Sequence, residues 1–265
     1  MYTGLLESLA SVTDLVVWSS GSLQHTALLW MICAFLGERP RTNVQAVVSD
    51  RGRERLDDQF GCIELEFRSD EIRALLGNGR ELGLGARRAA ARNWRAFTGR
   101  LPTAFNNRCR AAGISELNRF GKYHAGFFPR LAEKGLRVSL LDELLLTCVG
   151  EAWSLPSQII LRQSPEGIAL RSWLACAGDV SLGRRLRDWA RHSIPDPVLE
   201  SETTESDHIL RGVRYRLSSR GRALLKQGIR SVAEAPTCFI GGGTAYDPQV
   251  PVAASGNADW KLVRL

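Results

Sequence analysis

The chain has 265 residues, a formal net charge of +7, 44% hydrophobic residues and 24% charged residues. This composition is typical of a globular protein and excludes a disordered, collagen-like or disulfide-stapled chain. The length is sufficient to bury a sizeable core, and we expect more than one domain.

The first 82 residues predict strands that alternate with helices. Residues 15–18 form a short apolar run that ends in a polar turn, and an apolar helix begins directly behind it. Residues 44–48 and 62–67 predict a second and a third strand. Because alternating strands and helices favour a parallel sheet, we expect residues 1–82 to form a small α/β domain, one half of a Rossmann-like fold, within an α+β protein.

Residues 83–137 predict a basic helical connector. The stretch 84–137 contains twelve Arg or Lys residues and two acidic residues, so its net charge is about +10. A helix that begins near Gly85 places apolar and basic residues on opposite faces. Its apolar face contains Ala86, Ala90, Trp94 and Phe97, and its basic face contains Arg88, Arg92 and Arg95. The basic face is either a solvated surface or a site for a polyanion or an acidic partner.

Residues 138–232 predict a winged helix-turn-helix, in which three helices precede a strand, a loop and a second strand. Ser139, with Asp142 three residues later, is typical of a helix start. The expected elements are helices at 140–149, 156–161 and 179–191, strands at 198–200 and 211–217, and a final helix at 219–227. Residues 233–265 follow as a tail rich in Gly and Pro, with Trp260 near its end.

The third predicted helix of this domain is the one that a winged helix presents to its partner. One side of that helix is apolar, and it contains Leu182, Leu186 and Trp189. The opposite side is basic, and it contains Arg184, Arg187 and Arg191. These arginines and Arg214 are candidate residues for binding a partner or nucleic acid. Against DNA binding stand four acidic residues where the wing approaches phosphates, namely Glu200, Glu202, Glu205 and Asp207.

A candidate anion-binding turn follows the first predicted strand. Ser20, Gly21 and Ser22 lie between the carboxyl end of the strand and the start of a helix, where free N–H groups and the helix dipole attract anions. Trp18 precedes this turn, and His25 lies one helical turn behind it as a weak candidate for an acid or base. The alternative interpretation is that the serine only caps the helix.

Cysteine and histidine spacings predict no metal site and no cofactor. The six cysteines are scattered singly, which favours reduced and mostly buried thiols. The triplet 241–243 lacks the Lys-Ser/Thr ending of a phosphate-binding loop. The apolar run 27–36 is shorter than a bilayer requires, and no basic residue precedes Arg39, so we expect a cytoplasmic protein without a membrane partner.

The order of motifs resembles an uncharacterised bacterial family, catalogued as the domain of unknown function eighteen thirty-five. The resemblance covers most of the chain. It rests on Trp18, on the helix with Leu28-Leu29-Trp30, on Leu82-Gly83-Leu84-Gly85, on the helix 140–149, on Gly178-Asp179, on Tyr215-Arg216-Leu217-Ser218 with Gly221, and on Gly241-Gly242-Gly243 before Trp260.

The chain also departs from that family in two places. It is expected to lack the family's N-terminal region with a His-Val-Asn-Gly-Asp motif. Residues 18–22 read Trp-Ser-Ser-Gly-Ser where the family has Trp-Phe-Glu-His-Asp, so the carboxylates are missing. Any metal binding or acid–base chemistry that depends on those carboxylates in relatives is not available to the same groups here.

These observations favour a non-catalytic accessory protein that engages a protein or peptide partner through its winged helix and its basic helical faces. One alternative is a winged-helix DNA-binding transcriptional regulator. A second alternative is a divergent enzyme that acts on an anionic substrate at Ser20–Ser22.

Overall fold

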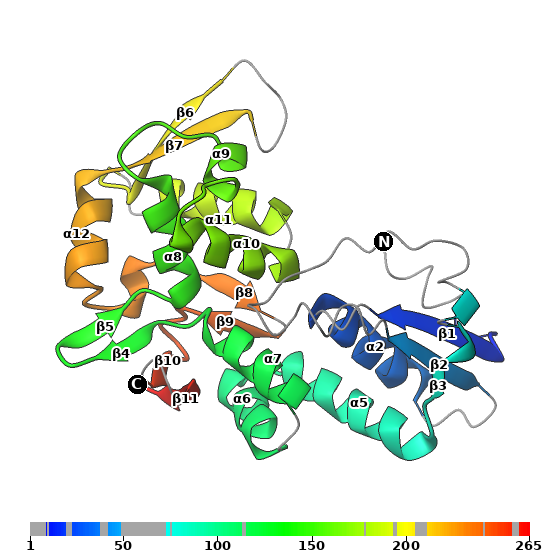
Figure 1. Cartoon of the computed structure of the whole chain (residues 1–265). Helices are drawn as coiled ribbons and strands as arrows, with labels where there is room; N and C mark the ends of the chain where they lie inside the picture. The colour runs from blue at the N-terminus through cyan, green and yellow to red at the C-terminus, as the bar shows by residue number, and fades with distance from the viewer. Residues whose placement is uncertain are drawn as a thin grey trace. The chain divides into compact units, whose positions relative to one another are not determined.

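The computed structural model describes two compact units, Met1–Thr98 and Gly99–Leu265 (Figure 1). The described residues are 9, 11–19, 23–37, 42–48, 73–74, 76–112, 115–177, 179–192, 195–204, 211–240, 242–255 and 260–265. They form helices and small sheets, which confirms the predicted α+β class. No helix within these ranges is long and apolar enough to cross a membrane.

The first unit contains a small three-stranded sheet and two long helices. Its elements are β1 (Asp14–Ser19), α2 (Leu23–Leu36), β2 (Asn43–Val48), β3 (Arg80–Glu81) and α5 (Leu84–Phe97). β1 and β2 are parallel and in register, which confirms the first two predicted strands. β3 adds an antiparallel strand that the sequence did not predict, and the predicted strand at 62–67 lies outside the described residues.

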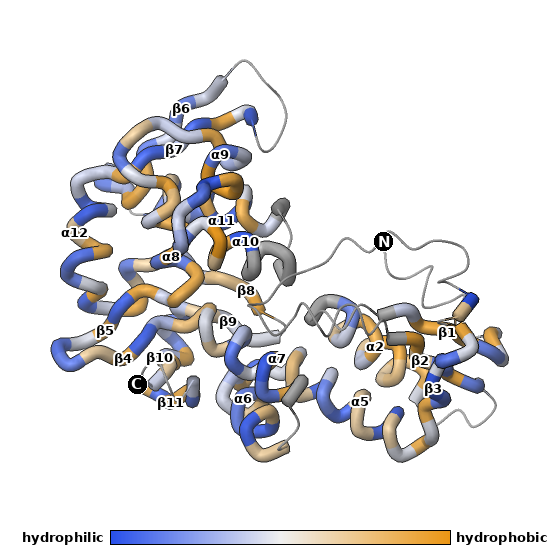
Figure 2. Tube along the Cα trace, viewed as in Figure 1, coloured by the Kyte–Doolittle hydropathy of each residue, from blue (hydrophilic) through white to orange (hydrophobic). Residues whose placement is uncertain are grey.

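Helix α2 carries no Asp, Glu, Lys or Arg residue, and all its residues from Ala27 to Leu36 are apolar, a pattern typical of a core helix (Figure 2). Ile32 and Leu36 of α2 pack with Val17 and Val44 of the sheet in the core of this unit. Helix α5 also packs against α2. The sheet and α5 thus both depend on α2 for their burial of apolar surface.

The division of the chain after Thr98 differs from the predicted domain boundary at residue 82. The reason is that α5 packs on α2 and belongs to the first unit rather than to a separate connector. The rest of the predicted connector, residues 99–137, belongs to the second unit, and so do residues 138–265. The Gly- and Pro-rich residues 233–265 are therefore part of this larger unit.

The second unit begins with helices, continues through a helical bundle and a hairpin, and ends in short strands. Its helices are α6 (Pro102–Ala111), α7 (Ser115–Ala125), α8 (Leu140–Val149), α9 (Pro156–Ile160), α10 (Pro165–Ala177), α11 (Asp179–Arg191), α12 (Ser219–Gln227) and the short η1 (Val232–Glu234). Its strands are β4 (Arg130–Ala132), β5 (Gly135–Arg137), β6 (Leu199–Thr203), β7 (Val213–Leu217), β8 (Cys238–Ile240), β9 (Gly243–Ala245), β10 (Val252–Ser255) and β11 (Lys261–Arg264).

Four helices, rather than the predicted three, precede the hairpin of this unit. The predicted helices correspond to α8, α9 and α11, and α10 lies between the last two. The start of α10 has a recognisable signal, because the Ser164 hydroxyl accepts a hydrogen bond from the Gly167 N–H, and Pro165 and Glu166 occupy the first turn. The prediction of three helices before the hairpin was therefore wrong, because α10 is a fourth helix.

Strands β6 and β7 form an antiparallel hairpin, from the pair Leu199 and Leu217 to the pair Thr203 and Val213. Ser154, just before α9, exchanges two backbone hydrogen bonds of 2.9 Å with Tyr215 of β7. Helix α12 begins directly behind β7, with the Ser218 hydroxyl accepting from the Gly221 N–H. The predicted residues 205–210 of the hairpin loop lie outside the described ranges.

The last strands of the chain join a sheet with the order β11-β10-β4-β5. The side-chain amide of Asn106 in α6 binds the backbone at the start of β11 through both of its polar atoms. Its Nδ2 donates to the Trp260 carbonyl at 3.0 Å, and its Oδ1 accepts from the Leu262 N–H at 2.8 Å. Gly121 of α7 leaves room for the Trp260 ring. A Cβ at Gly121 would lie only 2.1 Å from that ring and 2.8 Å from the Cβ of Cys109.

We expect the substitution Gly121→Ala to lower the free energy of unfolding by about 1–3 kcal/mol, because the added methyl group overlaps an aromatic ring in a packed interior. Thermal or denaturant unfolding measures this loss. Gly85→Ala is the control, since nothing lies within 4 Å of a Cβ at that position. Equal stability of the two variants would contradict this account of the Trp260 packing.

Candidate functional site

The predicted anion-binding turn lies outside the described residues at Ser20, Gly21 and Ser22. On either side of it, Trp18 is 39% exposed near the end of β1, and His25 is exposed on α2. The parallel strands β1 and β2 do end together at Ser19 and Val48, as the prediction requires.

Helix α5 exposes its three predicted basic residues, Arg88, Arg92 and Arg95. Its buried face is different from the predicted one, because Ala86 is exposed and Arg87 is buried. The Arg87 Nη1 donates to the Thr42 carbonyl at 2.9 Å, so a charged side chain takes a place in the interior of the first unit. Small residues at positions 90 and 91 complete that face.

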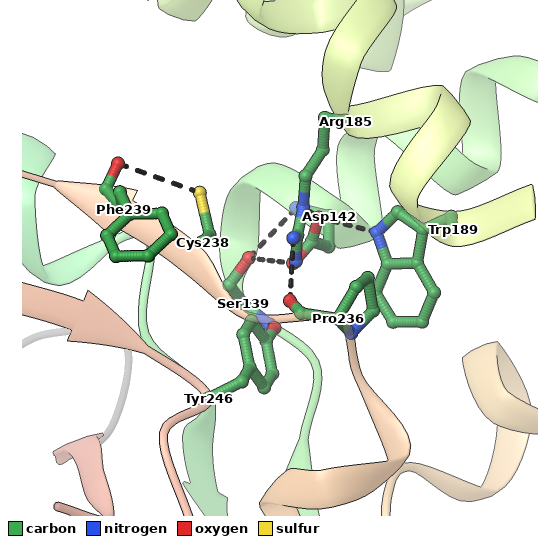
Figure 3. Close-up of polar contacts among 8 residues, drawn as sticks. All are labelled: Ser139, Asp142, Arg185, Trp189, Pro236, Cys238, Phe239 and Tyr246. Atoms are coloured by element: carbon green, nitrogen blue, oxygen red, sulfur yellow. Dashed lines mark hydrogen bonds and ion pairs between the residues drawn. The ribbon is translucent and has the colours of Figure 1, made fainter. Parts of the chain in front are cut away.

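Helix α11 buries the predicted apolar residues Leu182, Leu186 and Trp189. Arg185 lies on the same face and is only 5% exposed, which the sequence analysis did not predict. Its guanidinium meets the carboxylate of Asp142 in α8, which is 1% exposed (Figure 3). We call Ser139, Asp142, Arg185 and Trp189 the Asp142 cluster.

Every acceptor position of the Asp142 carboxylate is used. Its Oδ1 accepts from the Arg185 Nε at 2.7 Å and from the Trp189 Nε1 at 2.8 Å. Its Oδ2 accepts from the Arg185 Nη2 and from the Ser139 hydroxyl, both at 2.8 Å. The Ser139 hydroxyl in turn accepts from the Asp142 N–H at 3.0 Å and caps α8, as the sequence predicted.

The segment that follows α12 closes the Asp142 cluster from a third direction (Figure 3). The Pro236 carbonyl accepts from the Arg185 Nη1 at 2.7 Å. The fully buried Tyr246 hydroxyl accepts from the Ser139 N–H, and the Arg185 guanidinium lies 5.5 Å from the centre of the Tyr246 ring. Tyr246 has a φ of 59°, a left-handed conformation that is uncommon for an aromatic residue.

The electrostatics of the Asp142 cluster stabilise the ionised pair. Burial alone would raise the pKa of the Asp142 carboxyl, but the charge of Arg185 and the hydrogen bonds from Arg185, Trp189 and Ser139 outweigh it and lower that pKa. Burial raises the pKa of Tyr246 well above its ordinary value, so this hydroxyl stays protonated. With all its acceptors occupied, the Asp142 cluster is a structural element that orients α11.

The outer face of α11 presents the predicted arginines. Arg184, Arg187 and Arg191 are exposed, and none of them forms an ion pair within the described part of the chain. We call these three residues the α11 arginine stripe. The charges of Arg187 and Arg191 act on the Tyr215 hydroxyl. Burial raises the pKa of that hydroxyl, and the two arginines lower it in part.

The structure separates Arg214 from the α11 arginine stripe. Side chains alternate along a strand, so Arg214 and Arg216 point to the opposite side of β7 from Tyr215. Arg214 pairs with Glu202 at 3.2 Å, and Arg216 pairs with Glu200 at 2.5 Å. The Arg216 guanidinium also lies 4.6 Å from the centre of the Trp153 ring. The acidic residues of the hairpin thus neutralise its own arginines.

Other titratable groups do not gather into a site. Among the described residues no group of three or more His, Cys, Asp and Glu side chains is placed to hold a metal ion. Cys33, Cys109 and Cys148 are buried free thiols, as predicted, and burial raises the pKa of Cys109 to about 12. His124 packs between Phe105 and Phe128, and burial lowers its pKa to about 3.

Sequence reasoning missed the Asp142 cluster, although one signal for it was present. Arg185 interrupts an apolar stripe, three residues after Leu182 and four before Trp189. A charged residue on the buried face of a helix requires a buried partner. The identity of that partner depends on a contact across 43 positions, which periodicity does not reveal.

Comparisons of the chain with protein families, with curated proteins and with solved structures found no match.

We expect Asp142→Asn to lower the free energy of unfolding by about 3–5 kcal/mol, because it leaves the Arg185 charge buried without its counter-charge. The matched control is Glu202→Gln, which breaks an exposed pair and costs less than about 1 kcal/mol. The stabilising contribution of Asp142 is complete above its unfolded pKa, near 4, and is lost as pH falls through its lower folded pKa. Denaturant unfolding measures both effects, and equal losses for the two variants would contradict them.

The burial of His124 gives the free energy of unfolding a second, separate dependence on pH. The unfolded chain binds a proton at this residue below about pH 6.5, whereas the folded chain does so only near its pKa of about 3. The free energy of unfolding therefore falls by up to about 1.4 kcal/mol per pH unit between these values. His124→Gln removes this slope and His192→Gln retains it. An unchanged slope in the His124 variant would show that another group titrates.

Proposed function

We propose that this protein is a non-catalytic binding protein, in which residues 138–232 form a winged-helix arrangement that engages an acidic protein or peptide partner. Membership of the family catalogued as the domain of unknown function eighteen thirty-five is part of the same proposal. The described residues add no support for a divergent enzyme at Ser20–Ser22, because that turn lies outside them.

The winged-helix assignment rests on the elements around the hairpin. A helical bundle, α8 to α11, precedes the strands β6 and β7. Ser154 forms an isolated antiparallel bridge with Tyr215 beside the hairpin, in the place of a third strand, and α12 follows β7 directly. A short strand between the first helices that pairs with the last strand of the hairpin is typical of winged helices. Helix α10 is an addition to the usual order.

The observation that carries the proposed function is the exposed α11 arginine stripe, whose members form no ion pair with any residue that the structure describes. Arg184, Arg187 and Arg191 stand three and four positions apart, so their side chains are neighbours on one face and repel one another. The Asp142 cluster fixes the opposite face of the same helix. A rigid helix that exposes three arginines, none of them in an ion pair with a described residue, is suited to an anionic partner.

The charge of the hairpin favours a protein partner over DNA. A DNA-binding wing contributes positive charge near the phosphates. Here the Glu200 and Glu202 carboxylates are paired with Arg216 and Arg214, so the described strands add no net positive charge. The binding surface consists of a basic helix beside a neutral hairpin. A protein surface, whose acidic and apolar groups are separated, fits it better than the continuous negative charge of a phosphate backbone.

We expect the triple substitution Arg184→Gln, Arg187→Gln, Arg191→Gln to weaken binding of a labelled pool of acidic peptides by about 10-fold to 100-fold, since each exposed charge pair contributes up to about 1 kcal/mol. Fluorescence anisotropy at physiological salt measures the affinity. The matched control removes three positive charges from α12 and its end, through Arg222→Gln, Lys226→Gln and Arg230→Gln, and changes affinity less than about twofold.

The same titration with random duplex DNA tests the competing function. Equal weakening by both triple variants would show that only net charge matters and would contradict the proposal. Tighter binding of DNA than of the peptides at physiological salt, with a steep salt dependence that the α11 substitutions flatten, would identify a nucleic-acid reader instead.

A further inference from the structure

We propose that the partner segment which contacts the α11 arginine stripe is an α-helix with three acidic side chains on one face, separated by three and by four residues. This inference rests on the proposed function and specifies the form in which the partner presents its negative charge.

The exposed surface of α11 is a single row of side chains. Arg184, Arg187 and Arg191 are exposed, whereas the flanking positions are buried, namely 182, 183, 185, 186, 189 and 190. Helix α10 and strand β6 pack against α11, and the Asp142 cluster fixes its inner face. One partner segment that runs along the axis of α11 can therefore contact all three arginines.

The spacing of the stripe along the helix axis favours a helical partner over an extended one. An α-helix rises about 1.5 Å per residue, so Arg184 and Arg187 are about 4.5 Å apart along the axis, and Arg187 and Arg191 are about 6 Å apart. A second helix repeats these separations when its carboxylates have the same spacing in sequence. Side chains on one face of an extended strand recur about every 6.6–6.8 Å, so three of them span about 13 Å, against about 10.5 Å for the stripe.

The order of the two spacings depends on the direction of the partner helix. A helix parallel to α11 matches the stripe with spacings of three and then four residues, and an antiparallel helix matches it with four and then three. In both directions the central carboxylate lies opposite Arg187. A helix also holds its three carboxylates on one face before binding, so it loses less conformational freedom on the fixed surface of α11 than a flexible acidic peptide does.

Asp188 is the one acidic residue within the span of the stripe. It is half-buried and lies between Arg187 and Arg191 in the sequence. Its charge opposes an acidic partner, but the three arginines leave the exposed row with a net positive charge. Removal of this carboxylate is therefore expected to tighten the binding of an acidic helix.

The test measures the binding of labelled peptides to the full chain by fluorescence anisotropy at physiological salt. Two matched peptides carry three glutamates on one helical face, with spacings of three and four or of four and three residues. A scattered peptide has the same composition, with its glutamates distributed around the helix, and a fourth peptide has a proline in the centre of each matched sequence. Circular dichroism verifies which peptides are helical. We expect one matched peptide to bind at least about tenfold more tightly than the scattered and the proline-containing peptides.

A charge exchange tests whether the central contact exists. We expect Arg187→Glu to abolish the preference for the matched peptide, and a lysine in place of the central glutamate of that peptide to restore it. Arg222→Glu on α12 is the control and changes neither affinity by more than about twofold. Asp188→Asn is expected to tighten binding of the matched peptide about twofold to fivefold. Thermal unfolding verifies that each variant is folded.

Two results would overturn the inference. One is equal affinity for the matched and scattered peptides, and the other is a failure of the charge exchange to restore binding. If the peptides bind equally but all lose affinity when the α11 arginine stripe is replaced by glutamine, the proposed function stands and only the helical form of the partner fails. If no peptide depends on the stripe, both fail.

Discussion

A carboxylate and a guanidinium meet in the interior of the second unit, and three separate parts of the chain are arranged around them. Asp142 comes from α8, Arg185 and Trp189 come from α11, and the Pro236 carbonyl belongs to the segment behind α12. Burial of one charge without the other would be strongly unfavourable, so the three segments are stable only together. This requirement therefore also determines which face of α11 is exposed.

Local signals in the sequence predicted much of the secondary structure. The Ser139 cap with its apolar run predicted α8, and the helix predicted at 219–227 agrees with the observed bounds of α12. The parallel pairing of β1 with β2 also follows from short apolar strands on either side of a helix. In these places the preferences of a few adjacent residues agree with the final fold, and for that reason local reasoning succeeds.

Predictions from the sequence failed where the outcome depends on distant contacts. The two compact units divide after Thr98 rather than at residue 82, because α5 packs on α2, a contact that charge composition does not reveal. Arg187 and Arg214 have the same charge and were grouped together, yet one is exposed without an ion pair in the described part and the other is paired with Glu202. Net charge is visible in a sequence, but neutralisation is decided by cross-strand neighbours.

The sheet β11-β10-β4-β5 joins segments that are far apart in the chain. Ala254 of β10 pairs with Arg130 of β4, and Asn106 accepts a hydrogen bond from the N–H of Leu262, 156 positions later. During synthesis from the N-terminus, α6, α7 and β4 emerge long before the strands that cover them. The surfaces under Trp260 and Leu262 therefore stay uncovered until β10 and β11 have been synthesised. Closure of this unit depends on contacts between residues 156 positions apart, such as Asn106 with Leu262, so it is slower than the folding of the local helices.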